Sequence, residues 1–482
     1  MARFSLTLIL FLFQLVIFAG KDGYQIKFKI HGLKDTTCLV ANYYGSGTYV
    51  TDTLEVNGKG EAIFSAPSDQ PRGVYILVIS DKIYFDFVLN NDLKFTMETD
   101  MKDPVGAMKI TGSLDNEEFY DYMRYNQEKF KHIQELQQQL KEVEKNEDSV
   151  VVLNKKIVEL NDEIIEYKLK IARERPFSFL AMLINAMKEP VIKEIPTLPN
   201  GRKDSTYAYR FYKDHFWDDM VIADNRLIRT PVFHNKLKKY VDQVVAQNPD
   251  SIFKEAGILI EKARSDPEMF KYLVWFFTYH YENSEIMGFD KVFVDIVDRY
   301  YVTGEATWVS GKVLENILKK TNRIRPLLLG SQAPNMIMMD TTEQLVSLYN
   351  IKAFITILLF WDPDCGHCEK EIPHLKELYD KDHEKYELEI FAVCSDTSMA
   401  KMKQHMIKKK MTWVNVNGPR TLTGDYHELY DIQTTPVIYI LDWEKRILAK
   451  RLQSDQVEKF IDNYVKNRLD RLDKLDRLDL GN

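Results

Sequence analysis

The sequence predicts a multidomain chain with an N-terminal antiparallel β-sandwich, a central α-helical region and a C-terminal α/β domain. Three observations predict this order: alternating strand patterns up to residue 113, a long segment without Gly or Pro after them, and alternating strands and helices from Gly330 onward. With 482 residues, 45% of them hydrophobic and 28% charged, the chain has enough apolar material for several cores. This composition argues against a mostly disordered chain.

Charge and cysteine content narrow the function classes. The formal net charge is −7, from 65 Lys and Arg against 72 Asp and Glu. Because no basic excess exists to bind phosphates, nucleic acid is not an expected partner. Four cysteines cannot form a disulfide scaffold in a chain of this length, so they direct attention to a redox or metal-binding pair.

Residues 1–20 have the layout of a secretory signal peptide. Arg3 precedes an apolar run from Leu6 to Phe18, and the small residues Ala19 and Gly20 follow. We expect cleavage near this point, because the run is short for a bilayer span; the alternative is an uncleaved N-terminal anchor. The mature chain is then expected in an oxidising compartment outside the cytoplasm.

Residues 21–113 are predicted to form the β-sandwich. Apolar side chains alternate with lysines in residues 24–30, which predicts a strand with one buried and one solvent-exposed face. Further β-rich runs at 73–80, 82–90 and 93–99 are separated by turn-forming residues.

Residues 114–175 contain neither Gly nor Pro, and their apolar residues follow helical spacing. Ser113 or Asp115 is placed to cap the start. A polar break at 146–149 predicts a helical hairpin rather than one rod. Two roles stay open: a solvated spacer, or a coiled coil through which the chain forms an oligomer.

Residues 176–329 are predicted to form a helical, aromatic-rich domain. Its histidines His215, His234 and His280 have no metal-binding spacing, so we expect packed or surface side chains. This region offers no signal for chemistry.

Residues 330–466 read as an α/β domain. A β-branched, apolar run at 353–361 is typical of a central strand buried on both faces, and the strand 388–394 and the helix 399–409 follow it. The tail, 467–482, repeats Arg/Lys-Leu-Asp at period three and reads as a helical extension or a frayed end.

The chemistry lies in residues 360–373, where Cys365 and Cys368 form a CGHC motif between a buried strand and a helix. Unpaired backbone amides at a helix N-terminus stabilise a thiolate on the first cysteine, and a protonated His367 adds to this effect. Asp362 and Asp364 act in the opposite direction, so the sign of the net pKa shift does not follow from sequence.

A CxxC pair alone permits three interpretations: a redox pair, a metal site or a structural disulfide. Structural zinc needs two further ligands, and the nearby candidates, His374 and Cys394, form no standard spacing. The redox interpretation is favoured, and no metal ligand is assigned.

The sequence FWDPDCGHC, with Pro373 five residues after the second Cys and Thr435-Pro436 downstream, resembles the TlpA/ResA-type branch of the thioredoxin superfamily. The likeness covers roughly residues 330–465, and the two preceding regions resemble domains of unknown function in Bacteroidetes-type envelope proteins. The resemblance implies a thioredoxin fold, a thiol:disulfide oxidoreductase activity in the periplasm or cell envelope, and no dissociable cofactor.

The resemblance also implies roles for single residues. Cys365 and Cys368 would be the catalytic pair, with the Thr435–Pro436 bond cis and its backbone beside the substrate. Trp361 would pack under the active site; a plain core tryptophan is the alternative.

A base for the second thiol is also implied. Leu359 occupies the position at which thioredoxins carry a buried aspartate, so Glu371, three residues after Cys368, would take that thiol's proton. An exposed helix glutamate is the alternative. The CGHC sequence is the motif of protein disulfide isomerases, which leaves the direction of electron flow open.

The other cysteines and the neighbouring peroxiredoxin class complete the prediction. Leu358 and Asp362 replace the Pro and Thr or Ser of the peroxidatic pattern, which excludes that class. Cys394 is predicted to be a buried structural cysteine, with a third redox thiol as the alternative, and Cys38 a strand core residue.

The sequence therefore predicts a periplasmic thiol–disulfide oxidoreductase that acts on protein thiols or disulfides and exchanges electrons with a membrane or periplasmic partner. The β and helical domains would hold substrates. The alternatives are a copper- or zinc-binding envelope protein that uses the CxxC pair, and a scaffold on which the thioredoxin fold is only a platform.

Overall fold

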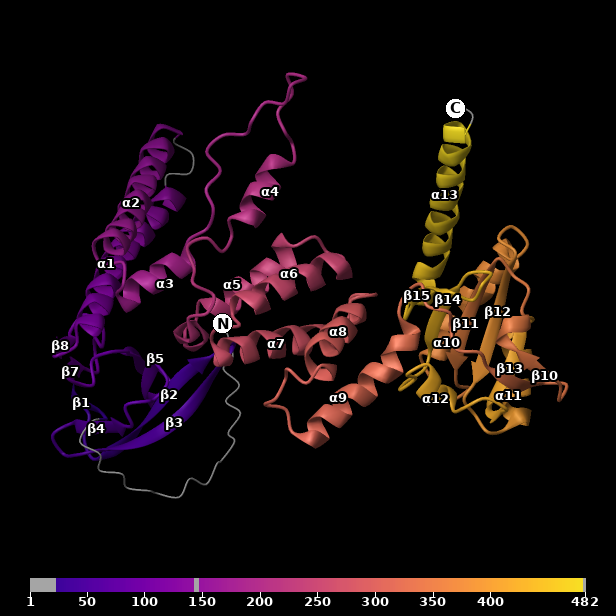
Figure 1. Ribbon diagram of the computed structural model, residues 1–482, viewed down its shortest axis with the longest axis horizontal. Helices are drawn as coiled ribbons and strands as arrows, with labels where there is room; N and C mark the ends of the chain where they lie inside the picture. The colour runs from indigo at the N-terminus through magenta and orange to yellow at the C-terminus, as the bar shows by residue number, and fades with distance from the viewer. Residues whose placement is uncertain (1–22, 143–146, 480–482) are drawn as a thin grey trace. The chain divides into compact units, whose positions relative to one another are not determined.

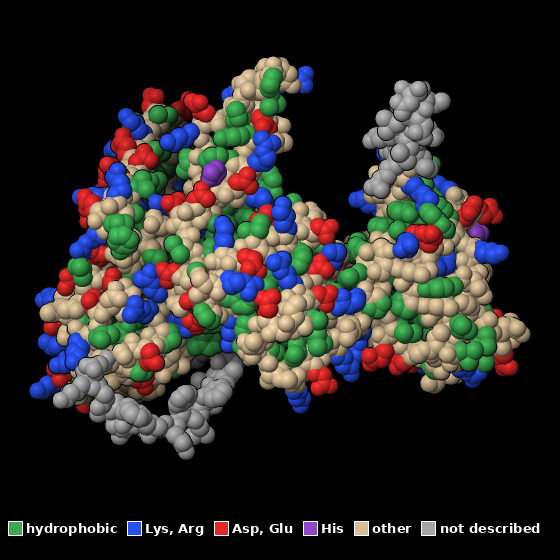
Figure 2. All heavy atoms as spheres, viewed as in Figure 1, with side chains coloured by type: hydrophobic (Ala, Val, Ile, Leu, Met, Phe, Trp, Pro, Cys, Tyr) green, Lys and Arg blue, Asp and Glu red, His purple; other side chains and the backbone are tan. Residues whose placement is uncertain are grey.

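A computed structural model describes residues 23–142 and 147–479 (Figure 1). The signal-peptide prediction, for residues 1–20, lies outside this part of the chain. The described residues form two compact units, the first containing residues up to Val245 together with Lys262–Met269, and the second Ala246–Glu261 together with everything from Phe270. Side chains of both charge signs are interspersed over the visible surface (Figure 2). No described helix has the length and apolar character needed to cross a bilayer.

The N-terminal region is a sandwich of two four-stranded sheets, with orders β4-β1-β7-β8 and β3-β2-β5-β6. All strand pairs of the sandwich are antiparallel except β1 and β7, which run parallel. The strands are β1 Tyr24–His31, β2 Thr36–Tyr44, β3 Gly47–Val56, β4 Glu61–Ala66, β5 Gly73–Ser80, β6 Ile83–Leu89, β7 Lys94–Asp100 and β8 Lys109–Thr111.

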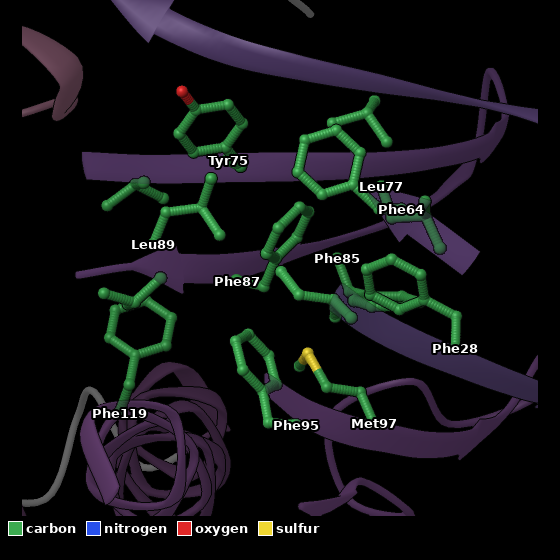
Figure 3. Close-up of a cluster of buried hydrophobic side chains, with 14 of the residues drawn as sticks. Phe28, Phe64, Tyr75, Leu77, Phe85, Phe87, Leu89, Phe95, Met97 and Phe119 are labelled. Atoms are coloured by element: carbon green, nitrogen blue, oxygen red, sulfur yellow. The ribbon is translucent and has the colours of Figure 1, made fainter. Parts of the chain in front are cut away.

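The sandwich core consists of aromatic and aliphatic side chains from both sheets (Figure 3). Phe87 is fully buried at its centre, with ring centroids 5.2 Å from Phe28, 5.7 Å from Tyr75 and 6.2 Å from Phe64. In β1 the buried positions alternate with exposed or half-exposed ones, as the lysine alternation predicted.

A helical hairpin follows the sandwich. Helix α1 (Leu114–Glu142) begins after Ser113, whose hydroxyl accepts a hydrogen bond from the Asn116 amide at 3.4 Å. Helix α2 (Glu147–Glu174) returns alongside it, with Tyr125 and Tyr167 stacked at a centroid distance of 4.0 Å. Of the predicted break at 146–149, residue 146 lies outside the described residues and the rest opens α2.

The remaining helical region contains short helices, among them the 3₁₀ turns η1 and η4 and the π-helical segments η2 and η3. These elements are α3 Phe179–Met187, α4 Tyr207–Asp214, η1 Asn225–Arg229, α5 Phe233–Lys239, η2 Tyr240–Val244, α6 Pro249–Lys262, α7 Pro267–Glu282, α8 Asp290–Ile296, η3 Val297–Val302, α9 Gly311–Ile324 and η4 Arg325–Leu327.

The C-terminal domain is built on a seven-stranded sheet with the order β10-β9-β13-β12-β11-β14-β15. Its elements are β9 Ile337–Asp340, β10 Leu345–Ser347, η5 Leu348–Asn350, β11 Ile355–Trp361, α10 Cys368–Asp382, β12 Leu388–Cys394, α11 Met399–Lys409, β13 Val414–Thr421, α12 Tyr426–Leu429, β14 Val437–Leu441, β15 Ile447–Lys450 and α13 Ser454–Asp479. Residues 467–479 of the predicted tail are thus part of α13, and the last three lie outside the described residues.

Strand β11 is buried along its whole length, in agreement with its apolar sequence. It pairs in parallel with β12 and antiparallel with β14. Its alternate residues enter two cores: Leu359 and Trp361 pack with α10, α11 and α13, whereas Leu358 and Phe360 pack on the opposite face. The chain leaves this interior strand at Trp361, shortly before the CGHC motif, so the motif lies at the carboxyl end of β11.

Candidate active site

The two cysteines of the motif differ in their exposure. Cys365 lies in the loop between β11 and α10 and is partly exposed, whereas Cys368 is the first residue of α10 and is fully buried. Both are free thiols. One sulfur is therefore accessible to a partner molecule and the other is not.

The Cys365 sulfur both accepts and donates a hydrogen bond. The backbone amide of Cys368 donates to the Cys365 Sγ at 3.2 Å, and the thiol itself donates to the Thr435 carbonyl at 3.1 Å. Burial raises the pKa of Cys365, but hydrogen bonds from the side chains of Cys368 and Thr435 and from the backbone amides of Cys368 and His367 outweigh it, so the pKa lies below its ordinary value of 9.0. This determines the sign of the shift that sequence left open.

Cys368 has the opposite character. Burial, and then its contact with Cys365, raises the pKa of the Cys368 thiol to about 12. At neutral pH this thiol stays protonated until its environment changes, while Cys365 ionises more readily.

The two aspartates of the motif have partners that limit their effect on the thiolate. Asp362 accepts a hydrogen bond from the Ser395 hydroxyl. Asp364 pairs with Lys401, which also lies 2.9 Å from Asp396. The positive charge of Lys401 offsets two carboxylates near the motif, an arrangement that depends on the position of α11.

Thr435 and Pro436 lie beside Cys365, just before β14. The Thr435–Pro436 peptide bond is cis, as the resemblance implied. The loop that contains Thr435 and Pro436 borders a pocket of about 360 Å³. The pocket is lined by His367, Glu371, Asp431, Gln433, Thr434, Thr435, Pro436, Val437, Arg451, Leu452 and Gln453. The pocket lies beside the accessible sulfur, because Thr435 both lines it and contacts Cys365.

Glu371 points to the start of α13. Its Oε2 accepts a hydrogen bond from the backbone amide of Ser454 at 2.7 Å. Burial raises the pKa of Glu371, but the bonds from Ser454 and the charges of His374 and His367 outweigh it, so the pKa lies below its ordinary value of 4.5. The carboxylate is therefore ionised at neutral pH, which a proton acceptor requires.

Trp361 ends β11 and is completely buried. Its ring lies 5.1 Å from the ring of His405, a buried residue of α11. Cys394 is the β12 residue in register with Trp361; it is also fully buried, and burial raises its pKa to about 12. Cys38 is buried in the β-sandwich, where burial raises its pKa to about 11.

Metal ligands do not gather around the motif. Among the residues described by the structure, no three His, Cys, Asp or Glu side chains form a cluster that could hold a metal ion. His374, one of the two candidate further ligands, has its Nδ1 3.1 Å from the Ser454 hydroxyl.

Family models match all three regions of the chain. Residues 24–119 match a domain of unknown function (DUF4369), residues 125–327 match another (DUF5106), and residues 329–450 match the AhpC/TSA family. The ResA thiol-disulfide oxidoreductase of Bacillus thuringiensis is 26% identical over 141 residues, which are 29% of this chain and 77% of that protein. The C-terminal domain is ResA-like: it matches the AhpC/TSA family model and is similar in sequence to ResA thiol-disulfide oxidoreductases. This confirms the resemblance drawn from the motif.

Solved structures are similar to the same ResA-like domain. A domain of a possible thiol-disulfide isomerase from Cytophaga hutchinsonii is 38% identical and covers 30% of this chain and 96% of its own, with a TM-score of 0.28. The thioredoxin domain of a thiol-disulfide oxidoreductase from Bacteroides vulgatus is 30% identical and covers 28% and 97%, with a TM-score of 0.25.

Sequence reasoning missed several residues around the active site of the ResA-like domain. Lys401, which pairs with Asp364, and Ser454, which binds Glu371, belong to elements far along the chain. His405 under Trp361 is a further example. No local motif marks these residues, because their contacts arise only when α11 and α13 pack on the sheet.

Proposed function

We propose that the chain catalyses thiol–disulfide exchange on protein substrates through Cys365 and Cys368, in the periplasm or cell envelope. The observation that carries this is the contrast between the two sulfurs. Cys365 is accessible, has a lowered pKa and accepts a hydrogen bond from the Cys368 backbone amide, while Cys368 is buried and has a raised pKa. A nucleophile and a protected resolving thiol need these properties.

The proposed reduction has two steps. The Cys365 thiolate attacks one sulfur of a substrate disulfide, a mixed disulfide forms, and the other substrate sulfur leaves as a thiolate. Cys368 then loses its proton and attacks the Cys365 sulfur, which releases the second substrate thiolate and leaves a Cys365–Cys368 disulfide. Two electrons pass to the substrate, so a membrane or periplasmic dithiol partner must reduce the pair again; oxidation is the reverse.

Neighbouring residues have proposed supporting roles. When Cys365 ionises, it no longer donates to the Thr435 carbonyl, which is then free to accept a backbone amide of the substrate. Pro436 shapes the same pocket. Glu371, ionised at neutral pH, would receive the Cys368 proton, and His367 would add positive charge near the sulfur. Trp361 supports the motif from the core.

A redox titration tests this proposal. The full chain is equilibrated in glutathione buffers, and the state of the Cys365–Cys368 pair is read by alkylation and mass. A reversible two-electron transition supports the proposal. A midpoint potential of about −270 mV indicates a reductase, and one of about −180 mV indicates oxidation or isomerisation. If the pair does not cycle, the oxidoreductase proposal is wrong, and metal titration of the CxxC pair becomes the next experiment.

A further inference from the structure

A second pocket of about 650 Å³ lies next to the pocket that contains Thr435 and Pro436, within the same compact unit. Its walls come from the loop between α7 and α8, from α9 and from the sheet edge at β15. The two pockets share Asp431, Arg451 and Leu452 in their linings. They are therefore neighbouring parts of one depression.

The shared residues form a fixed boundary between the two pockets. Arg451 Nη2 lies 3.0 Å from the Asp431 carboxylate. The same carboxylate forms an ion pair with Arg323 of α9, with Nη1 and Oδ1 3.4 Å apart. Both Asp431 and Arg451 have left-handed backbone, with φ of 49° and 58°. Non-glycine residues in this conformation cost free energy, and they concentrate where a ligand is clamped or a site is shaped.

The far wall of the second pocket is the loop 283–289, and it is fixed to the edge of the ResA-like domain. Lys450 of β15 donates through its side chain to the Leu327 carbonyl at 2.6 Å and pairs with Asp290. Its backbone amide lies 3.3 Å from the Met287 sulfur. Gly288 adopts φ +89°, and a Cβ there would lie 2.9 Å from Leu329. The loop is thus anchored to β15 at Met287 and, just after its end, at Asp290.

The chemistry of this wall points to a polypeptide. Glu282 pairs with Lys320 at 2.9 Å, and Asp290 and Asp431 pair with Lys450 and Arg451, so three of the four acidic lining residues are neutralised within the pocket. Next to these pairs Ile286 and Met287 expose apolar side chains, to 57% and 37%. Paired charges with an apolar edge suit a peptide segment with an apolar side chain better than a small ion.

We propose that the two pockets form one groove for the substrate polypeptide, and that Ile286 and Met287 of the helical region contact an apolar side chain several residues from the target cysteine. This inference rests on the proposed function, because the groove has a defined direction only if Cys365 carries the mixed disulfide. A polypeptide fits this groove because the two pockets are continuous. The pocket beside Cys365 shares Asp431 and Arg451 with the pocket that Ile286 and Met287 line. The helical region would then select substrates for the redox domain.

A kinetic comparison tests this inference with the full chain. One probe is a small aromatic disulfide. The others are long peptides whose central cysteine is disulfide-linked to thionitrobenzoate. Each peptide carries either leucine or alanine several positions before or after that cysteine. Cys365 attack releases thionitrobenzoate, which is measured by absorbance. We expect the chain to prefer one leucine peptide, and the Ile286→Ser, Met287→Ser double variant to lose roughly tenfold in kcat/KM for that peptide only.

The control is Ile407→Ser, which removes an equally apolar side chain, 79% exposed, from α11. It should leave every rate unchanged. If the double variant reacts with the leucine peptide as the unaltered chain does, or slows all probes equally, the groove proposal is wrong. If the unaltered chain does not react even with the small disulfide, the proposed function itself fails, which is a distinguishable result.

A cross-linking experiment gives an independent readout. In the Cys368→Ser variant the peptide stays attached to Cys365, and a benzophenone side chain in place of the leucine is photolysed. Labelling of residues 283–289 is the expected result. Labelling confined to other surfaces would overturn the proposal.

Discussion

The Cys365 thiol donates a hydrogen bond to the backbone carbonyl of Thr435, 3.1 Å away and 70 residues later in the chain. This contact joins the end of the interior strand β11 to the loop before β14. It brings the accessible sulfur, the cis Thr435–Pro436 bond and the adjoining pocket together at one edge of the sheet. The reactivity proposed for the CGHC motif depends on this junction as much as on the motif itself.

The contrast between the two thiols predicts selective alkylation. In the reduced, folded chain, iodoacetamide should modify Cys365 alone near neutral pH, with a titration midpoint below 9.0, because the other three cysteines are buried and have raised pKa values. Mass spectrometry of timed samples measures this. Equal labelling of Cys365 and Cys368, or a midpoint at or above 9.0, would contradict the account.

The Glu371 carboxylate predicts a pH-dependent contribution to stability. Since its pKa is lowered in the folded state, the stabilisation is fully present above the unfolded value, near 4.5, and is lost as the pH falls through the folded value. We expect Glu371→Gln to lower the free energy of unfolding by about 1 kcal/mol at neutral pH, and by less in acid. Urea unfolding at several pH values measures the difference.

The matched control is Glu377→Gln, because Glu377 is an exposed carboxylate on the same helix, α10. It should change stability little at any pH. A Glu371→Gln effect that is the same at all pH values would show that the charge does not contribute.

Glu371→Gln also tests the proposed proton transfer. If Glu371 accepts the Cys368 proton, the variant should form the mixed disulfide at an unchanged rate and resolve it at least roughly tenfold more slowly. Single-turnover quenching with acid separates the two steps. A normal resolving step would assign Glu371 only the role of binding the Ser454 amide.

Cys394 is predicted to take no part in the redox cycle. It is fully buried and its pKa is raised to about 12. Cys394→Ala should therefore leave the exchange rate within about twofold and the redox midpoint unchanged. Disulfide exchange with a small substrate and the glutathione titration measure both quantities; a large loss in either would indicate a third redox thiol.

The β-sandwich core predicts a stability effect that is independent of the chemistry. Phe87→Ala removes a fully buried ring from contact with three aromatic side chains and should cost about 3–5 kcal/mol in the unfolding of the first compact unit (Figure 3). Tyr84→Ala, on the same strand but 52% exposed, should cost far less. Exchange with a small disulfide should be unchanged in both variants, and a loss of exchange in Phe87→Ala alone would contradict this independence.

The sequence predicted most of the fold where a local pattern decides the structure. The strand 388–394 and the helix 399–409 have the predicted bounds, and β11 lies within its predicted run. The short strands β9 and β10 were missed, because three or four residues carry too little periodicity and form only by pairing at the sheet edge. The predicted domain boundaries and the oligomer through the helical hairpin remain predictions.

In the candidate site, too, only the residues that lie in one local motif could be predicted from the sequence. Cys365 and Cys368 are recognisable because strand, motif and helix are contiguous in the chain. The sign of the Cys365 pKa shift required the Thr435 side chain and the Cys368 amide in place. The loop 283–289 carries no functional signal in the sequence, since the role we propose for it depends only on its position beside β15.

Trapping of the mixed disulfide is the most direct test of the central claim that Cys365 attacks and Cys368 resolves. The full chain, its Cys368→Ser variant and its Cys365→Ser variant are each mixed with a disulfide-containing protein, quenched with acid and separated without reductant. We predict that Cys368→Ser accumulates a reducible covalent complex through Cys365, that the unaltered chain forms it only transiently, and that Cys365→Ser forms none. A complex of equal yield in Cys365→Ser, or none in Cys368→Ser, would contradict the account.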